Sequence, residues 1–325
     1  VKSIVGDDLT DKIFCDLFAG TGVVGRNFKK EVKKVISNDM EFYSYVLNKN
    51  YIENHEFLDN EIYIKELNET NGEEGFIFNE YSENGKANRL YFSEHNGKKI
   101  DAIRTKIEFW KTEKKISSAL YYFLLASLLE SADKVANTAS VYGAFLKVLK
   151  KTAQKPFRLL PAEMIVDKQT HEVYNEDINI LIKKITGDIL YLDPPYNHRQ
   201  YATNYHLLET IAKYDNPQIH GKTGLRNYEN QKSIFCSRNK VKNAFKELIV
   251  NANVKYIFLS YNNEGLLSLE DIKEIMSLRG KYGFFTKTYK RFKADKDDYR
   301  EYKADSTTEY VHYVVCENNM SINLG

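Results

Sequence analysis

The chain has 325 residues, of which 42% are hydrophobic and 28% are charged, and it contains no apolar run of the length that crosses a bilayer. This composition argues against the disordered, fibrous and membrane-spanning classes, and the length suits one large α/β domain or a core with an inserted lobe. Because 47 Lys and Arg oppose 45 Asp and Glu, the net charge of +2 neither demands nor excludes a polyanionic partner.

The first predicted unit is a strand, a turn, a helix and a second strand. Residues 13–18 form an apolar run that is closed by a glycine-rich turn at residues 20–25. Residues 23–30 are predicted to form a helix and residues 35–37 the next strand. Such a βαβ unit pairs its strands in parallel and begins a doubly wound sheet.

The middle of the chain predicts an inserted, largely helical lobe. Between residues 56 and 86, nine acidic residues oppose two lysines, which predicts a solvated, partly irregular surface element. Apolar residues at three-and-four spacing predict helices over 117–134 and 141–151. The predicted division of the chain is 1–54 for the first part of the sheet domain, 55–165 for the lobe and 166–325 for the rest of the sheet domain.

Strands and helices then alternate to the end of the chain. Predicted strands cover 172–174, 189–193, 254–260, 282–289 and 309–316, and predicted helices cover 203–213, 240–251 and 269–278. This alternation predicts a doubly wound, mostly parallel Rossmann-like sheet with helices on both faces.

The glycine turn fits the pattern GxGxxG and is followed, about twenty residues on, by Asp39 at the end of the next predicted strand. Glycines let a ligand approach the backbone closely, and an acidic side chain at that strand end accepts hydrogen bonds from a ribose diol. The turn therefore predicts a site for an adenosine-bearing cofactor. A tight turn that binds no ligand is the alternative.

A second motif, Asp193-Pro194-Pro195-Tyr196, follows the predicted strand 189–193. Ligands of open α/β sheets bind outside the carboxyl ends of the strands, so both motifs should face one pocket. An amino group on an aromatic ring is a weak nucleophile, and the Asp193 carboxylate and Pro194 carbonyl would accept its two N–H groups, while the Tyr196 ring would stack on a flipped base. The alternatives are a helix cap for Asp193 and a core aromatic for Tyr196.

These two motifs together resemble the adenine-specific (N6) DNA methyltransferases, in the Dam-like group whose cofactor motif precedes the catalytic motif. Weaker similarities lie at Asn38-Asp39, at residues 175–177 and at residues 258–262. The resemblance implies S-adenosyl-L-methionine as the cofactor and a flipped adenine in double-stranded DNA as the methyl acceptor. It also implies sequence-specific action within a restriction-modification system, with a possible cognate restriction endonuclease.

Carried onto this sequence, the resemblance implies two sets of site residues. The catalytic set is Asp193, Pro194, Pro195 and Tyr196, and the cofactor-binding set is Asp16, Phe18, Ala19, Gly20, Gly22, Asp39 and Asp177. The family usually has a further segment before the first strand that binds the methionine end of the cofactor. About a dozen residues precede that strand here and none matches, so we expect this contact from elsewhere or from residues before Val1.

Basic residues are concentrated after the second motif. Between residues 220 and 246, seven Lys and Arg oppose one Glu, which predicts a flexible basic loop that contacts phosphates; a solvated helix face is the alternative. The predicted DNA contacts are Arg199, Gln200, Lys222, Arg226 and Arg238. Exposed polar candidates for base discrimination in the lobe are Arg89, Arg104, Lys106, Asn137 and Ser140.

Other functions remain open at this point. The same chemistry on cytosine N4 or on adenine in RNA is the nearest alternative, since RNA recognition relies on stacking. An NAD-dependent oxidoreductase leaves the second motif unexplained, and a DNA-binding module without activity is the third alternative. Three distant cysteines lack metal-ligand spacing and no leader is recognisable, so we expect no metal site and a cytoplasmic location.

Overall fold

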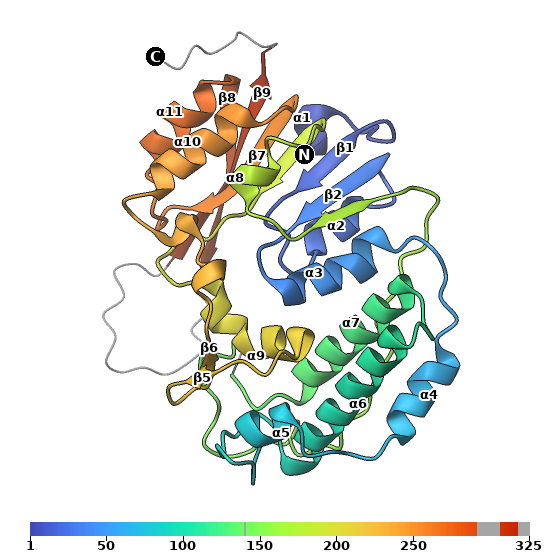
Figure 1. Cartoon of the computed structure of the whole chain (residues 1–325). Helices are drawn as coiled ribbons and strands as arrows, with labels where there is room; N and C mark the ends of the chain where they lie inside the picture. Colours follow the sequence, from blue (N-terminus) through green and yellow to red (C-terminus); the bar gives the residue numbers. More distant parts are fainter. Residues whose placement is uncertain (140, 291–305, 318–325) are drawn as a thin grey trace.

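The computed structural model describes residues 1–139, 141–290 and 306–317 (Figure 1). Within these residues a sheet of seven strands has the order β3-β2-β1-β4-β7-β9-β8. Strands β1 to β4 and β7 are parallel, whereas β9 is antiparallel to both β7 and β8. The bounds are β1 Ile13–Asp16, β2 Lys34–Asn38, β3 Glu172–Tyr174, β4 Ile189–Leu192, β7 Tyr256–Asn262, β8 Gly280–Lys290 and β9 Ser306–Cys316. The predicted Rossmann-like α/β fold is confirmed.

Both faces of the sheet are buried, which explains why its central strands are almost wholly apolar. Successive side chains of a strand point to opposite faces, so Phe14 and Ile189 belong to one hydrophobic cluster while Cys15 and Leu190 belong to another. Parallel strands covered on both sides need apolar residues at every position.

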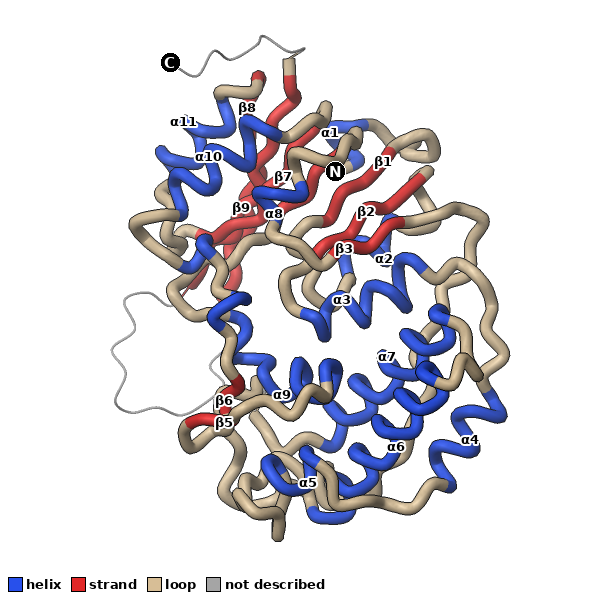
Figure 2. The backbone as a smooth tube through the Cα atoms, in the orientation of Figure 1, coloured by secondary structure: helices blue, strands red, loops and turns tan. Residues whose placement is uncertain are grey.

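Short helices cover the two faces (Figure 2). The first face is covered by α2 Val23–Phe28 and α3 Phe42–Asn48, and a π-helical turn, η1, spans Lys49–Glu53. Helix α9 Tyr201–Lys213 packs against α3. The second face is covered by α8 Ile178–Leu181, α10 Val241–Asn251 and α11 Leu269–Ser277. The remaining short helix α1 is Lys2–Val5. None of the helices in the described part of the chain is long and apolar enough to span a membrane.

Four of the helices between β2 and β3 in the chain lie in the lower half of Figure 1. They are α4 Glu61–Glu69, α5 Phe76–Tyr81, α6 Glu94–Thr112 and α7 Ser118–Val135. Helix α7 packs against α3 and α9, so the hydrophobic cluster on the first face of the sheet continues into these helices.

One expectation for this region is wrong and another is only partly met. The acidic stretch 56–86 is partly irregular and most of its acidic side chains are exposed, but it also contains α4 and α5, whose Leu67, Ile77 and Tyr81 are buried. Residues 141–151 form no helix, because the buried side chain of Asn137 fixes another backbone path. Its amide donates to the carbonyl of Leu146 (3.0 Å), and its oxygen accepts the Lys150 N–H (2.9 Å).

The two ends of the segment that carries these helices meet at one buried lysine. The ammonium group of Lys29 donates to the carbonyls of Tyr51, Asn54 and Ile165. Burial lowers the pKa of Lys29 to about 8. One side chain therefore joins the point where the chain leaves the sheet region to the point where it returns.

The basic segment between α9 and α10 begins with a small hairpin, β5 Ile219–His220 and β6 Leu225–Arg226. Two tyrosines from the segment between β2 and β3 bind the hairpin. The Tyr81 hydroxyl donates to the Gly224 carbonyl (2.7 Å), and the Tyr91 hydroxyl donates to the Thr223 carbonyl (2.9 Å). Two 3-10 turns follow, η2 Glu229–Gln231 and η3 Ile234–Cys236.

Candidate active site

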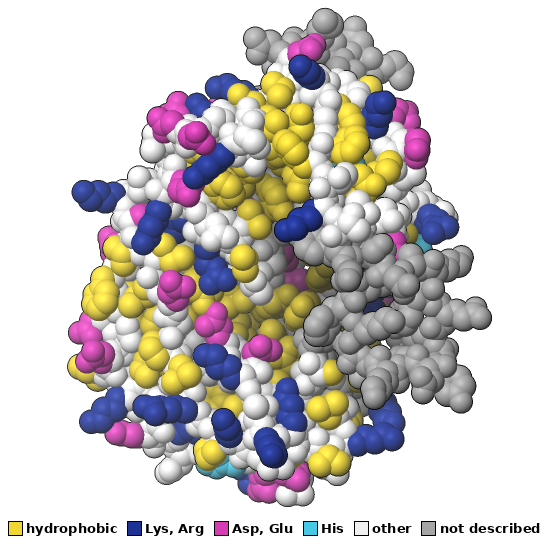
Figure 3. Space-filling view, turned by 180° about the vertical axis from the view of Figure 1, so that it is seen from behind, with side chains coloured by type: hydrophobic (Ala, Val, Ile, Leu, Met, Phe, Trp, Pro, Cys, Tyr) yellow, Lys and Arg dark blue, Asp and Glu magenta, His cyan; other side chains and the backbone are white. Residues whose placement is uncertain are grey.

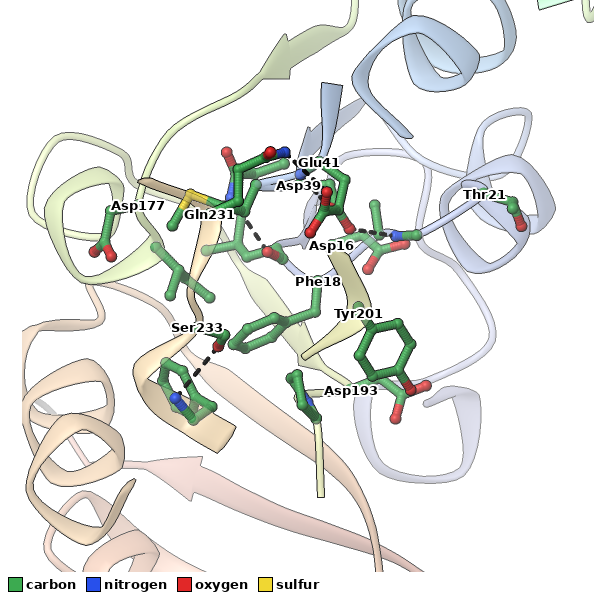
Figure 4. A pocket seen from close by; sticks show the side chains of 18 of the residues that line it. Asp16, Phe18, Thr21, Asp39, Glu41, Asp177, Asp193, Tyr201, Gln231 and Ser233 are labelled. Carbon is green, nitrogen blue, oxygen red and sulfur yellow. Dashed lines mark hydrogen bonds between the residues drawn. The ribbon is translucent and has the colours of Figure 1, made fainter. Parts of the chain in front are cut away.

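A pocket of about 350 Å³ opens at the carboxyl ends of β1, β2 and β4 (Figure 4). Its walls come from the glycine turn, the residues after β2 and β4, the start of α8, the start of α9, and the segment 231–235. The two sequence motifs, about 170 residues apart, meet here because β1 and β4 are parallel neighbours that end at the same edge of the sheet.

The glycine turn needs glycine for two physical reasons. Gly20 and Gly22 have φ values of 53° and 77°, in the left-handed region that side chains disfavour. A Cβ at Gly22 would also lie 2.6 Å from Oδ1 of Asn48. The same Asn48 donates to the Gly20 carbonyl (2.9 Å), so the turn is tied to α3.

The carboxyl groups of Asp16, which is buried, and of Asp39, which is half-buried, hold the glycine turn. Asp16 accepts the Gly25 N–H (3.1 Å), and burial raises its pKa to about 7. Asp39 accepts the N–H groups of Gly20 (2.8 Å) and Glu41 (2.9 Å), and burial raises its pKa to about 6. Both residues therefore shape the turn in addition to lining the pocket.

The other wall combines a helix cap with aromatic rings. Asp177 caps α8 by accepting the Asn179 N–H (2.8 Å), and Phe18 packs edge-on against Phe235 with ring centroids 5.0 Å apart. Six of the seven predicted cofactor residues line the pocket, and Gly22 does not. The six are Asp16, Phe18, Ala19, Gly20, Asp39 and Asp177.

Asp193 lies directly after β4 and faces the same pocket. Although the residue is exposed, the pocket walls dehydrate its carboxyl and, with a smaller effect of Glu309, raise its pKa to about 6. Pro195 also lines the pocket, whereas Pro194 and Tyr196 lie outside its lining. The Tyr196 ring is 38% exposed, and its carbonyl accepts the Leu266 N–H (3.0 Å).

Three tyrosines that no sequence motif predicted form a column beside Asp193. Tyr201 stacks on Tyr205 at 6.4 Å and 21°, and Tyr205 lies 5.4 Å from the ring of Tyr43. Tyr205 interrupts α9 with φ −125° and ψ 16°, which separates the first turn of that helix from the rest. Tyr201 points toward Asp193 in Figure 4.

A pair of buried carboxyl groups, those of Glu41 in the pocket wall and of Glu209, was also not predicted. Glu41 and Glu209 are 5% and 1% exposed, and each accepts a hydrogen bond of 2.8 Å from the side-chain amide of Gln231. Burial, followed by the nearby charges of Glu209 and Asp39, raises the pKa of Glu41 to about 9. Glu41 is therefore protonated at neutral pH, while Glu209 pairs with Lys213 at 2.6 Å.

Three of the five predicted DNA contacts are exposed cations. Arg199 follows the second motif, Lys222 lies in the β5–β6 hairpin, and Arg238 precedes α10. None of the three forms an ion pair within the described residues. On the face shown in Figure 3, Lys and Arg are scattered over the surface, and hydrophobic side chains gather between the two halves of the molecule.

The other two predicted DNA contacts are engaged inside the protein. Gln200 donates to the Ser233 carbonyl (3.2 Å) and accepts the Ser233 N–H (2.8 Å). Arg226 is 6% exposed and makes two hydrogen bonds, of 3.0 and 2.6 Å, to the Asp215 carboxylate. A buried guanidinium that is already paired cannot reach a phosphate without breaking this contact, so Arg226 has a structural role in this conformation.

Two of the five residues that were expected to be exposed candidates for base discrimination are buried. Arg104 is 2% exposed and donates to the carbonyls of Ile211 and Ala212 at the end of α9, and Asn137 is fully buried. Arg89 and Lys106 form ion pairs with Glu80 and Glu66, and Ser140 lies outside the described residues.

Comparisons with known proteins agree with this geometry. Residues 1–275 match the family model of the D12 class N6 adenine-specific DNA methyltransferases. The chain is 55% identical over 313 residues to the Type II methyltransferase M.NlaIII of Neisseria lactamica, covering 96% of this chain and 93% of that protein.

Two further relatives are more distant. The Type II methyltransferase M.CviAII of Paramecium bursaria Chlorella virus 1 is 39% identical over 301 residues, covering 89% of this chain and 86% of that protein. The Type II methyltransferase M.FokI of Planomicrobium okeanokoites is 40% identical over 333 residues, which cover 97% of this chain but only 50% of that longer protein. The chain therefore belongs to the D12 class N6 adenine-specific DNA methyltransferases.

Proposed function

We propose that the pocket binds S-adenosyl-L-methionine and that this chain methylates N6 of an adenine flipped out of double-stranded DNA. The observation that carries the proposal is the placement of Asp193, at the end of β4, in the same pocket as the glycine turn that follows β1. A carboxylate beside a nucleoside-type site is what methyl transfer to an aromatic amine requires.

The residues of the pocket fit this cofactor. The left-handed glycine turn leaves room at the backbone for a ligand, and Asp39 and Asp177 supply acceptors for a ribose and an adenine amine. Phe18 and Phe235 supply an apolar wall for a flat base. When bound, S-adenosylmethionine supplies an electrophilic methyl group.

The chain's own residues hold the methyl acceptor. The Asp193 carboxylate and the Pro194 carbonyl accept the two N–H groups of the adenine amine, and the exposed Tyr196 ring stacks on the base. As the amine nitrogen becomes positively charged, the carboxylate stabilises that charge. These roles require Asp193 in its ionised form.

The DNA-facing surface is assigned to two parts of the chain. Arg199, Lys222 and Arg238 are exposed and contact phosphates, while residues 55–165 contribute target recognition. The names of the relatives M.NlaIII and M.FokI support the assignment of this chain as the modification half of a restriction-modification system, with a cognate endonuclease as its partner.

The test is transfer of labelled methyl groups from S-adenosylmethionine to unmethylated genomic DNA, with nucleoside analysis of the product and RNA assayed in parallel. The expected product is N6-methyladenine in DNA. N4-methylcytosine, or label in RNA alone, would overturn the proposed acceptor. Absence of transfer despite tight cofactor binding would overturn the proposed substrate.

Asp193→Ala is expected to abolish turnover because it removes the acceptor for the amine. Asp193 does not support the glycine turn, so the cofactor dissociation constant should stay within about threefold of the wild-type value, a change of under about 1 kcal/mol. Calorimetry with S-adenosylhomocysteine measures this affinity. Simultaneous loss of binding and turnover would contradict the assigned role.

A further inference from the structure

The segment that leads from the basic hairpin to α10 forms one wall of the pocket. Gln231, Ser233, Ile234 and Phe235 all line it, and Figure 4 shows Gln231 and Ser233 on that side. Residues 231–235 therefore belong both to the chain segment that carries the exposed cations Lys222 and Arg238 and to the site proposed for the cofactor.

This wall is attached to the rest of the molecule by two side-chain amides. Gln200, at the start of α9, holds both backbone groups of Ser233. The side-chain amide of Gln231 donates to Glu41, after β2, and to Glu209, in α9, with two hydrogen bonds of 2.8 Å. Phe235 adds the ring contact with Phe18, which lies between β1 and the glycine turn.

The chemistry of position 231 calls for a primary amide. Its nitrogen carries two N–H groups, and each is directed to one carboxyl group. The groups that face this site are Glu41, Glu209, Asp39, Lys213 and Arg226. An apolar side chain would remove one donor from each of the two buried carboxyl groups, although Glu209 would keep Lys213 as a partner, and a carboxylate would add a further acid beside them.

We propose that Gln231 is a positioning residue that makes cofactor binding and DNA binding cooperative, because its amide fixes the DNA-facing segment as a wall of the cofactor pocket. The inference rests on the proposed function. A cofactor that contacts this wall stabilises the ordered segment, and DNA that contacts the ordered segment stabilises the wall. Linkage requires the two effects to be equal in size.

The test uses the full chain and compares the dissociation constant of S-adenosylhomocysteine with and without saturating unmethylated duplex DNA. In the wild type, DNA should tighten this binding by about tenfold, within the usual range of coupling between sites. In Gln231→Leu the tightening should fall below about twofold. Asn230→Leu is the matched control, because Asn230 is exposed on the same 3-10 turn, and it should retain the coupling.

A second variant guards against simple misfolding. Gln231→Asn keeps the amide but is one methylene shorter, so it should retain only one of the two bonds and give intermediate coupling, with a melting temperature between those of the wild type and Gln231→Leu. Coupling in Gln231→Leu equal to that of the wild type would overturn the inference, as would a wild type that methylates DNA but shows no coupling. A wild type without methyl transfer to DNA would instead overturn the proposed function.

Discussion

Asp193 combines a position in the pocket with a pKa close to neutrality. Because dehydration and Glu309 raise the pKa of its carboxyl to about 6, the ionised form that accepts an amine is lost as the pH falls through that value. We therefore expect kcat to decrease below about pH 6, tenfold per pH unit at the limit. The rate of single-turnover methyl transfer, measured as a function of pH, tests this decrease on the acidic side of the profile.

Glu309→Gln provides the control for that assignment. Glu309 lies opposite Asn262 in the β7–β9 pair, and its charge is the second cause of the raised pKa. Removing the charge should move the acid limb to lower pH without abolishing turnover. A limb that stays in place would show that another group controls it.

The raised pKa of Glu41 predicts that its contribution to the unfolding free energy decreases as the pH rises. Its pKa is about 9 in the folded protein and near its usual value of 4.5 when unfolded, so the folded state retains a proton that the unfolded state releases. The contribution of Glu41 to stability is thus lost as the pH rises from about 5 to 9, by up to about 1.4 kcal/mol per pH unit. Glu41→Gln keeps an acceptor for Gln231 and should flatten this slope in urea denaturation.

The exposed Glu270→Gln is the matched control and should leave the slope unchanged. His206 and His312 have pKa values lowered to about 4 by burial, so their effect on stability is complete near pH 6.5 and does not obscure the interval from pH 7 to 9. If the unfolding free energies of the wild type and Glu41→Gln had the same dependence on pH, the assignment of the retained proton to Glu41 would be wrong.

The sequence located the pocket residues that lie in local motifs and missed those that meet only in three dimensions. The glycine turn and Asp193 each follow an apolar strand, so the end of the strand located them. Gln231 lies 190 residues from Glu41 and 22 from Glu209, and no spacing rule joins them. Arg226 was misread because a basic residue in a basic stretch gives no sign that Asp215 will bury it.

At the scale of elements, Lys29 is expected to be a major support of the fold. Lys29→Met removes the donor for three carbonyl groups at both ends of the helical segment, which should cost about 2–4 kcal/mol of unfolding free energy. The neighbouring Lys30→Met changes an exposed side chain and should cost less than about 0.5 kcal/mol. Urea denaturation of both variants tests this, and equal effects would contradict it.

Strands were predicted better than helices for a physical reason. Burial on both faces makes each parallel strand a short apolar run, and the predicted runs end within about two residues of the ends of β1, β2, β3, β4 and β7. Helix α6 was missed because Asn96, Lys99, Asp101 and Arg104 resemble a solvent face but are buried. Their side chains bind backbone groups of neighbouring segments, such as the N–H of Ile77.

For the molecule as a whole, the distribution of charge predicts the salt dependence of DNA binding. The net charge is only +2, so binding should depend on a few exposed cations rather than on a uniformly basic surface. Lys222→Gln should reduce the slope of log K against log salt by about 1. Lys273→Gln, on α11, is the matched control, and titrations of labelled duplex at several salt concentrations measure both slopes.

Arg226→Gln is expected to behave differently from Lys222→Gln. Because its guanidinium is buried against Asp215, the substitution should lower stability and leave the salt slope of the folded protein close to the wild-type value. A reduction of the slope by 1 at unchanged stability would restore Arg226 as a phosphate contact.

Because β1 pairs with β4, part of the sheet cannot form until long after β1 has been synthesised. The Ile13 N–H bonds to Asp188, 175 residues later in the sequence. At about 5–20 residues per second, the ribosome completes β4 roughly 9–35 s after β1. During that interval the apolar residues Phe14 and Cys15 of β1 lie at an unpaired strand edge, because Ile189 and Leu190, which later pair with them, have not been synthesised. The edge of β1 that later pairs with β4 stays unpaired until β4 has been synthesised. A chaperone that prevents aggregation at this edge should therefore matter most before residue 190 has been added.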